Sequence, residues 1–151
     1  DYLIRQYGSF MQDVTEKFDV TCILLERVRD TLINIHKTQT RNSVHMQELG
    51  YINDQLDQPW MQLLASQDTK VEGFYKTPRL RQEISAIRAR GYGYSDATLR
   101  PKFKRLGFPV FKDEEMIGAL GLGGTILQIT DKNMETLVRY VQKRMKALSE
   151  K

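Results

Sequence analysis

The sequence predicts an α+β fold, in which helices pack on a mostly antiparallel sheet. Strand-like segments come in two pairs, and each pair is joined by a short turn, as antiparallel neighbours are. Helical segments precede, separate and follow these pairs, so strands and helices do not alternate singly. A length of 151 residues suits one core, and we therefore expect a single domain over residues 1–151.

Amphipathic helices are expected at both ends of the chain. Residues 2–18 carry apolar side chains at helical spacing, and so does the segment that follows an N-cap at Thr130 or Asp131. The two apolar stripes consist of Leu3, Tyr7, Phe10, Met11, Val14 and Phe18, and of Met134, Leu137, Val138, Val141, Met145 and Leu148. Such stripes indicate helices that each bury one face against the sheet.

Two shorter helices are expected in the middle of the chain. Pro59 and Pro78 each begin an apolar segment, and proline fits the first helical position because it lacks the N–H donor that would be unpaired there. Thr77 is a suitable N-cap for the second of these helices, and Gly91 is expected to end it. Residues 67–76, between the two helices, are predicted to form a loop.

The strand pairs lie on either side of these short helices. Residues 20–28 and 31–37 are rich in β-branched and apolar side chains, and we expect them to form the first hairpin. Residues 43–51 are a candidate for one more short strand. The second hairpin is expected to join 105–111 to 116–123 through an acidic turn.

Composition narrows the class of protein. Hydrophobic residues make up 40% of the chain and charged residues 28%, as in ordinary globular domains. The net charge is +4, but the basic residues are interleaved with acidic ones along the chain. We therefore interpret the basic side chains as solvated faces rather than a phosphate-binding surface.

No apolar run approaches the roughly 20 residues that span a bilayer, and no signal peptide is evident, so we expect a cytoplasmic protein without membrane contact. Because the chain begins at Asp1, we expect it to be part of a longer protein.

Few residues are suited to catalysis or metal binding. Cys22 is the single cysteine, and His36 and His45 are the two histidines, which excludes a zinc site of the usual paired-ligand type. Cys22 lies in a predicted apolar strand, where burial would raise its pKa and make the thiol unreactive. We therefore expect no metal, no cofactor and no enzyme activity.

The glycine-rich run from Gly118 to Thr125 needs an explanation, because glycines weaken a strand. The run lacks the Lys-Ser/Thr pair of a phosphate-binding loop. Gly121 and Gly123 are two residues apart and therefore lie on one face, where they leave a hollow. Either a large side chain such as Trp60 or Phe108 fills this hollow, or the hollow is a ligand cavity.

Arg105 is predicted on the strand opposite these glycines. On a regular strand Arg105 points to the opposite side from Leu106. A guanidinium on the cavity side could bind a carboxylate or phosphate through two parallel hydrogen bonds. The alternative is that Arg105 lies at the end of the strand, in water.

The segment from Leu80 to Gly124 resembles the effector-binding domain of IclR-type transcription regulators. That family has a helix ending in I-R-x-R-G-Y, an irregular acidic segment, a P-V-F strand, a turn and an A-L-S-V-S-G strand. This chain has IRARGY at 87–92, PVF at 109–111 and ALGLGG at 119–124. The preceding half matches through Leu63-Leu64-Ala65, where the family often ends a short helix in L-L-A.

The resemblance implies a GAF-like sensor with a curved, mostly antiparallel sheet flanked by helices. It implies a small organic effector, often a carboxylate or an aromatic compound, and assembly as a homodimer or homotetramer. Regulators of this type bind DNA through an N-terminal winged helix-turn-helix, which these 151 residues do not contain. Residues 1–18 would then be the linker and first helix of the effector-binding domain.

By position, the resemblance also implies the residues of an effector pocket. These are Gln58, Trp60, Met61, Ser95, Asp96, Arg105, Gly121 and Gly123. The chain departs from the family pattern here, since several members have serines at Gly121 and Gly123, a small residue or cysteine at Arg105, and A-x-G-K at residues 58–61. Because glycine offers no hydroxyl group, we expect a bulkier or more apolar ligand, or none.

Two other classes of function are considered. The first is a GAF-like oligomerisation module that binds no ligand because Trp60 fills the cavity. The second is a GAF-like enzyme such as a sulfoxide reductase, which would need several reactive cysteines. The single Cys22 argues against the enzyme.

Overall fold

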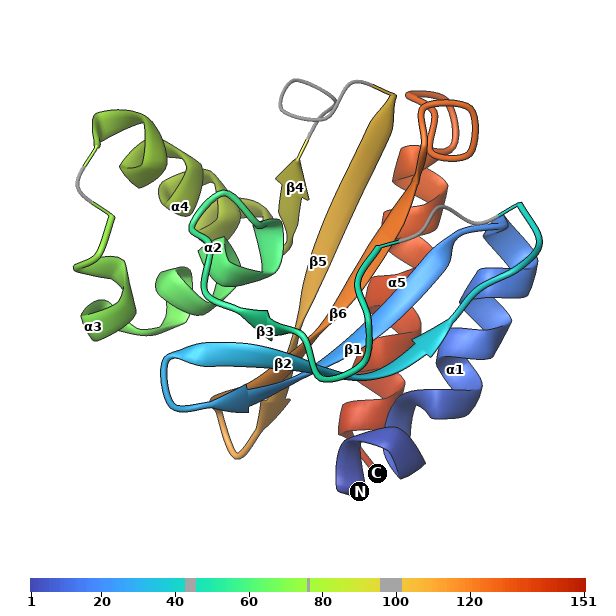
Figure 1. The fold of residues 1–151 in the computed structure, drawn as a ribbon, viewed down its shortest axis with the longest axis horizontal. Coiled ribbons are helices and arrows are strands. Elements are labelled where there is room, and N and C mark those ends of the chain that lie inside the picture. The colour runs from blue at the N-terminus through green and yellow to red at the C-terminus, as the bar shows by residue number, and fades with distance from the viewer. Residues whose placement is uncertain (43–45, 76, 96–101) are drawn as a thin grey trace.

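Six antiparallel strands form one curled sheet, with helices on both of its faces (Figure 1). The structure is a computed structural model that describes residues 1–42, 46–75, 77–95 and 102–151. In chain order its elements are α1 (Tyr2–Phe18), β1 (Thr21–Val28), β2 (Thr31–Thr38), β3 (Ile52–Asn53), α2 (Pro59–Gln67), α3 (Thr69–Glu72), α4 (Pro78–Arg90), β4 (Gly93–Ser95), β5 (Phe103–Lys112), β6 (Glu115–Thr125) and α5 (Met134–Ser149). The strands lie side by side in the order β3-β2-β1-β6-β5-β4.

The predicted α+β class and both predicted hairpins are confirmed. β1 pairs with β2, β5 pairs with β6, and the two hairpins join through the antiparallel pair of β1 and β6. Asp113 and Glu114 make the turn between β5 and β6, and both have positive φ, 52° and 67°. Two successive residues of positive φ give a two-residue hairpin turn whose twist matches that of the strands.

The additional strand lies later in the chain than predicted. β3 consists of Ile52 and Asn53, which pair with Leu32 and Ile33 of β2. Residues 46–51, which we assigned to a strand, form an irregular loop, and 43–45 lie outside the described residues. The Asn34 side chain donates to two carbonyl groups of this loop, which therefore bonds to β2 without forming a strand.

Two helix boundaries also differ from the prediction. The predicted loop at 67–76 contains α3, because the Asp68 side chain caps the N–H groups of Lys70 and Val71. The last helix has Asn133 as its N-cap rather than Thr130 or Asp131. The Thr130 hydroxyl accepts from the Asn133 N–H at 3.1 Å, and the Asn133 side-chain oxygen accepts from the Thr130 N–H at 2.9 Å. This reciprocal pair forms a turn ahead of the helix.

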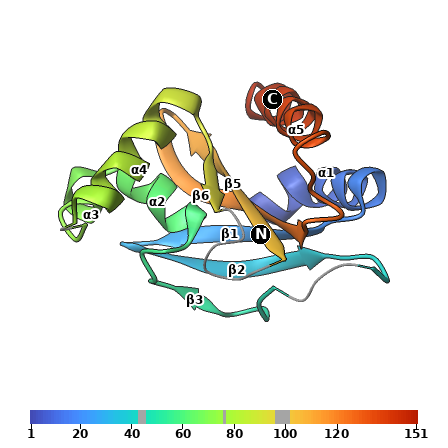
Figure 2. The same cartoon turned by 90° about the horizontal axis from the view of Figure 1, so that it is seen from above.

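The sheet is buried on both faces. α1 and α5 pack on one face, and α2, α3 and α4 lie beyond the other (Figure 2). Alternate residues of β1 divide between the two cores, so Cys22 and Leu24 pack with α1 and α5, whereas Ile23 and Leu25 pack with α2. Burial on both faces explains why β1 has an almost continuous apolar sequence instead of an alternating one.

Three glycines form a row across the sheet beneath α2. Gly93 of β4 is in register with Gly107 of β5, which is in register with Gly121 of β6. A Cβ atom on Gly93 would overlap the carbonyl group of Pro59, and one on Gly107 would lie 3.2 Å from the backbone nitrogen of Trp60. The row therefore lets the first turn of α2 approach the sheet at backbone distance.

Substituting a residue of this row should destabilise the domain. We expect Gly93→Ala to lower the free energy of unfolding by about 1–3 kcal/mol, because the methyl group forces the Pro59 backbone away from the sheet. The measurement is urea denaturation followed by far-UV circular dichroism. As a control, Gly8→Ala in α1 places its Cβ no closer than 3.8 Å to another atom and should raise stability by about 0.5–1 kcal/mol. Equal stability of Gly93→Ala and the wild type would contradict the close approach of α2.

Candidate functional site

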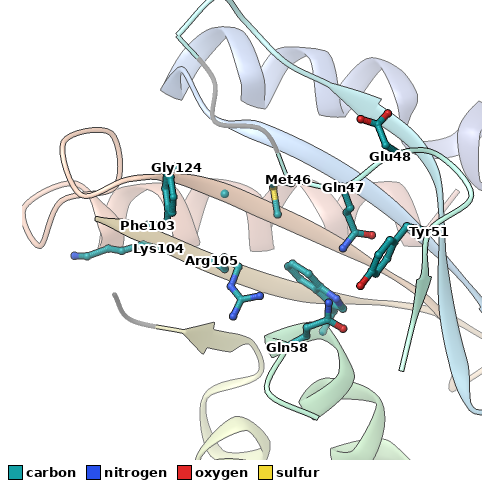
Figure 3. A pocket seen from close by; sticks show the side chains of 11 residues that line it. Met46, Gln47, Glu48, Tyr51, Gln58, Phe103, Lys104, Arg105 and Gly124 are labelled. Atoms are coloured by element: carbon teal, nitrogen blue, oxygen red, sulfur yellow. The ribbon is translucent and has the colours of Figure 1, made fainter. Parts of the chain in front are cut away.

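A pocket of about 330 Å³ lies between the loop at 46–51, the start of α2 and the adjoining ends of β5 and β6 (Figure 3). Its walls come from three parts of the chain that are distant in sequence. The lining residues are Met46, Gln47, Glu48, Tyr51, Gln58, Trp60, Phe103, Lys104, Arg105, Gly123 and Gly124. A cavity of this size, with mixed polar and apolar walls, is within the range of sites for small organic molecules.

The two glycines of the predicted hollow have different neighbours. A Cβ on Gly121 would lie 3.1 Å from the ring of Trp60 and 2.7 Å from Ile23, so these side chains fill the space above Gly121. Gly123 lines the pocket, and the Met46 side chain lies above it, with its sulfur 2.5 Å from where a Cβ would stand. Phe108 packs on the opposite face of the sheet, with α1 and α5. Trp60 and Ile23 therefore fill the predicted hollow above Gly121, Met46 covers Gly123, and the pocket lies beside these side chains.

The position of Trp60 is fixed by buried hydrogen bonds. Its indole N–H donates to the side-chain oxygen of Asn53 at 2.9 Å. The amide groups of Asn53 and Gln47 donate to each other, both at 2.9 Å, and the Asn53 amide also donates to the Leu32 carbonyl. Asn53 is fully buried. This network joins the loop, β2 and α2 around the indole ring.

Arg105 is half-buried, lies on the same side of the sheet as Trp60 and lines the pocket. Its guanidinium stacks over the Trp60 ring at 5.7 Å and donates to the Ser95 hydroxyl at 3.3 Å. The contact with the indole face orients the charged group at the pocket wall. Figure 3 shows Arg105 and Gln58 on one side of the opening and Met46 and Gln47 on the other.

The eight predicted site residues have different positions in the structure. Four of them, Gln58, Trp60, Arg105 and Gly123, line the pocket together. Ser95 bonds to Arg105, Gly121 lies beneath Trp60, and Met61 is buried in the core between α2 and the sheet. Asp96 lies outside the described residues.

Several lining residues were missed by sequence reasoning. They are Met46, Gln47, Glu48, Tyr51, Phe103, Lys104 and Gly124. Most of them belong to the loop that we had assigned to a strand, and an irregular loop has no periodicity that would show which side chains turn inward. The neighbouring glycine was the one available signal, since Gly124 continues the run that drew attention to this strand.

Among the residues that the structure describes, no group of three or more His, Cys, Asp or Glu side chains is placed to hold a metal ion. Cys22 is fully buried, and its pKa is raised to about 12 by desolvation, against which hydrogen bonds with Thr15 and Thr38 act only partly. Its thiol is therefore protonated at neutral pH and cannot serve as a nucleophile. In the same described part of the chain, no helix is long and apolar enough to cross a membrane.

The fold is shared with solved structures of transcription regulators, although no protein-family profile and no curated protein sequence matches the chain. The chain is similar to the IclR protein of Thermotoga maritima, with a TM-score of 0.86 and 17% identity over 99% of this chain and 68% of that one. An IclR-family regulator from Brucella abortus has a TM-score of 0.80 and 12% identity over 98% of this chain and 62% of its own. The chain thus spans about two thirds of the length of these two proteins.

A third similar structure is an isolated domain. It is described as the C-terminal domain of a transcriptional regulator from Vibrio cholerae, with a TM-score of 0.81 and 14% identity over 95% of this chain and 94% of that one. The chain therefore has the fold of the C-terminal domain of IclR-family regulators. The resemblance that we inferred from the sequence motifs is confirmed for the fold.

Breaking the network around Trp60 should loosen this site. We expect Asn53→Ala to lower the free energy of unfolding by about 2–4 kcal/mol, because the Trp60 N–H and the Gln47 amide lose their buried partners. Trp60 is the single tryptophan, so its emission maximum reports directly on this change and should shift to longer wavelength. Gln55→Ala, at an exposed position two residues after Asn53, is the control and should leave both quantities unchanged. An unshifted spectrum for Asn53→Ala would contradict the role given to the network.

The buried thiol should make stability depend on alkaline pH. The Cys22 pKa is about 12 in the folded chain and 9.0 when unperturbed, so above pH 9 the unfolded chain releases a proton that the folded chain retains. This contribution to stability is complete below pH 9 and is lost as the pH rises toward 12, with a slope of at most about 1.4 kcal/mol per pH unit. Denaturation curves of the wild type and of Cys22→Ala are measured between about pH 8 and 10.5, a range that brackets the unperturbed pKa of the thiol. The difference between the two proteins isolates this slope. If the free energy of unfolding falls with pH equally in the two proteins, burial does not raise the pKa of the Cys22 thiol.

Proposed function

We propose that this chain is the effector-binding domain of an IclR-type transcription regulator and that a small organic molecule binds in the pocket beside Trp60. The proposal rests on one observation, a cavity of about 330 Å³ lined by Met46, Trp60, Arg105 and the β6 glycines, in a fold that known regulators share. The volume suits a single-ring or short-chain compound, since it lies near the lower end of the range for ligand pockets, about 300–1,000 Å³.

The chemistry of the walls supports an organic acid. Met46, Trp60 and Phe103 provide apolar surface for a ring or an alkyl chain. The Arg105 guanidinium carries five N–H donors in a planar group, a geometry that matches the two oxygens of a carboxylate. Several family members have serines at the positions of Gly121 and Gly123, and these glycines offer no hydroxyl group. In this proposal Arg105 therefore recognises the acidic group of the ligand.

Binding would affect regulation through the loop at 46–51. A ligand in the pocket contacts this loop on one side and β5 and β6 on the other, and it therefore stabilises conformations in which the two are close. In an assembly of two or four chains, such a shift changes the relative positions of the DNA-binding regions, which we place outside these 151 residues. A regulator of this type acts in the cytoplasm, where bacterial DNA is found.

A second candidate function is oligomerisation without a ligand. Leu49, Tyr51 and Ile52 expose 60%, 46% and 56% of their surface beside the edge of the sheet, as expected for side chains that a partner covers. In this case Trp60 would act only as a filler of the core. Self-association in sedimentation, combined with no response to any compound in the ligand screen, would favour this second function over the first.

A ligand screen tests the leading proposal. We expect at least one compound from a set of aromatic acids, keto acids and sugar acids to raise the melting temperature and to change Trp60 fluorescence, because a ligand that binds only the folded state stabilises it. A ligand at one hundred times its Kd adds about 2.7 kcal/mol. Arg105→Gln should weaken binding about tenfold to a hundredfold, the usual effect of losing a charge-assisted hydrogen bond.

Arg139→Gln is the matched control for this substitution. Arg139 lies on the exposed face of α5, where it pairs with Glu135, and its replacement should change neither binding nor stability. If no compound alters the melting temperature or the Trp60 spectrum, the pocket is not an effector site. If a compound binds equally well to Arg105→Gln, the carboxylate assignment is wrong.

A further inference from the structure

Gln58 is an unusual residue for its place in the chain. It is the N-cap of α2, a position that favours Ser, Thr, Asp or Asn because their short side chains bond to the first N–H groups of a helix. The Gln58 side chain makes no such bond. Its main chain is fully used, since the carbonyl accepts from the N–H groups of Met61 and Gln62, both at 3.1 Å, and its own N–H donates to the Gln55 carbonyl. The side chain therefore serves neither the helix nor the loop.

The end of this side chain is buried at the wall of the pocket without a partner. Gln58 is only 8% exposed, and its side-chain oxygen is shielded from solvent and has no hydrogen-bond partner within the described part of the chain. A buried carbonyl oxygen of this kind is rare in folded proteins, because its lost hydration is not replaced. An explanation for Gln58 must therefore supply a donor.

The polar side chains of Trp60, Gln47 and Asn53 are already bonded to each other. The single donor of Trp60 goes to Asn53, and the amides of Gln47 and Asn53 form a reciprocal pair. The space that Gln58 adjoins is the pocket itself, which Figure 3 shows between Gln58, Arg105 and Met46. Because the last torsion of glutamine is soft, rotation about it can turn the amide oxygen into this space.

We propose that Gln58 selects the ligand of the pocket by accepting a hydrogen bond from it, so that the preferred ligand is a hydroxy- or amino-substituted organic acid rather than the corresponding keto or unsubstituted acid. This inference rests on the proposed function and adds the second group that the ligand must carry. The acid group faces Arg105 and the hydroxyl or amino group faces Gln58, which lies beside Arg105 at the opening (Figure 3). Met46 and Phe103 contact the remaining carbon skeleton.

Matched sets of acids test the inference by isothermal titration calorimetry. The first set is phenyllactate, phenylpyruvate and phenylpropionate; the second is lactate, pyruvate and propionate; the third is hydroxybenzoate and benzoate. We expect the hydroxy member of the set that binds to bind about fivefold to thirtyfold more tightly than its partners, the effect of one hydrogen bond to a buried acceptor. In Gln58→Met, which keeps the shape of the side chain but accepts no comparable bond, the members of that set should bind equally.

A second measurement separates this role from a structural one. Because Gln58→Met removes an unpaired buried group, the melting temperature of the unliganded variant should equal or exceed that of the wild type. A marked fall would mean that the Gln58 amide is bonded within the fold and would overturn the inference. Gln55→Met, at an exposed neighbouring position, should leave binding and melting temperature unchanged.

The outcomes distinguish this inference from the proposed function. If acids bind without preference for the hydroxy member, or if the keto member binds best, the role of Gln58 is wrong and the effector pocket stands. If no member of any set binds to the wild type, this inference fails, and the wider ligand screen decides separately whether the pocket is an effector site.

Discussion

The first turn of α2 lies against the backbones of three neighbouring strands, at positions where only glycine leaves room for it. Gly93, Gly107 and Gly121 stand in register across β4, β5 and β6, and a side chain at any of them would meet Pro59, Trp60 or Leu63. This close approach brings the Trp60 side chain against the sheet, where its ring covers Gly121 of β6. The pocket lies beside Trp60, lined by Gly123, Gly124 and the Met46 side chain that covers Gly123.

Buried polar groups then determine the shape of the other wall. Asn53 bonds at once to the Trp60 indole, to Gln47 and to the Leu32 carbonyl, so one side chain joins the loop to both the sheet and α2. Networks of this kind favour a single arrangement, because a shift that breaks one bond leaves a buried group unpaired. Gln58 differs from the side chains of this network, since its side-chain oxygen has no described partner, as is also true of the Asn34 side-chain oxygen and the Tyr75 hydroxyl.

Much of the fold could be predicted because local patterns and tertiary packing agree. Apolar stripes at helical spacing gave α1 and α5, prolines gave the starts of α2 and α4, and the two hairpins followed from their short turns. The loop at 46–51 could not be predicted, because its conformation depends on Asn34 and Asn53, which lie on strands before and after it and have no local signature. For the same reason the sequence led to Gln58, Trp60, Arg105 and Gly123 but not to Met46 or Tyr51. The contrast between Gly121 and Gly123 was equally invisible, since identical residues two positions apart differ only in what folds over them.

The pocket has a base and a cover of separate origin. The base belongs to the hairpin of β5 and β6, whose glycines are constrained by the packing of the whole domain, whereas much of the cover is the short loop at 46–51, attached to the sheet by asparagine side chains at its flanks. Substitutions of loop residues outside the Asn53 network, such as Met46, alter the cavity without disturbing the packing of α2 on the sheet. Variation in this one surface segment can therefore reshape the cavity while the core stays the same, and the fold itself is retained in proteins that share only 12–17% identity with this chain.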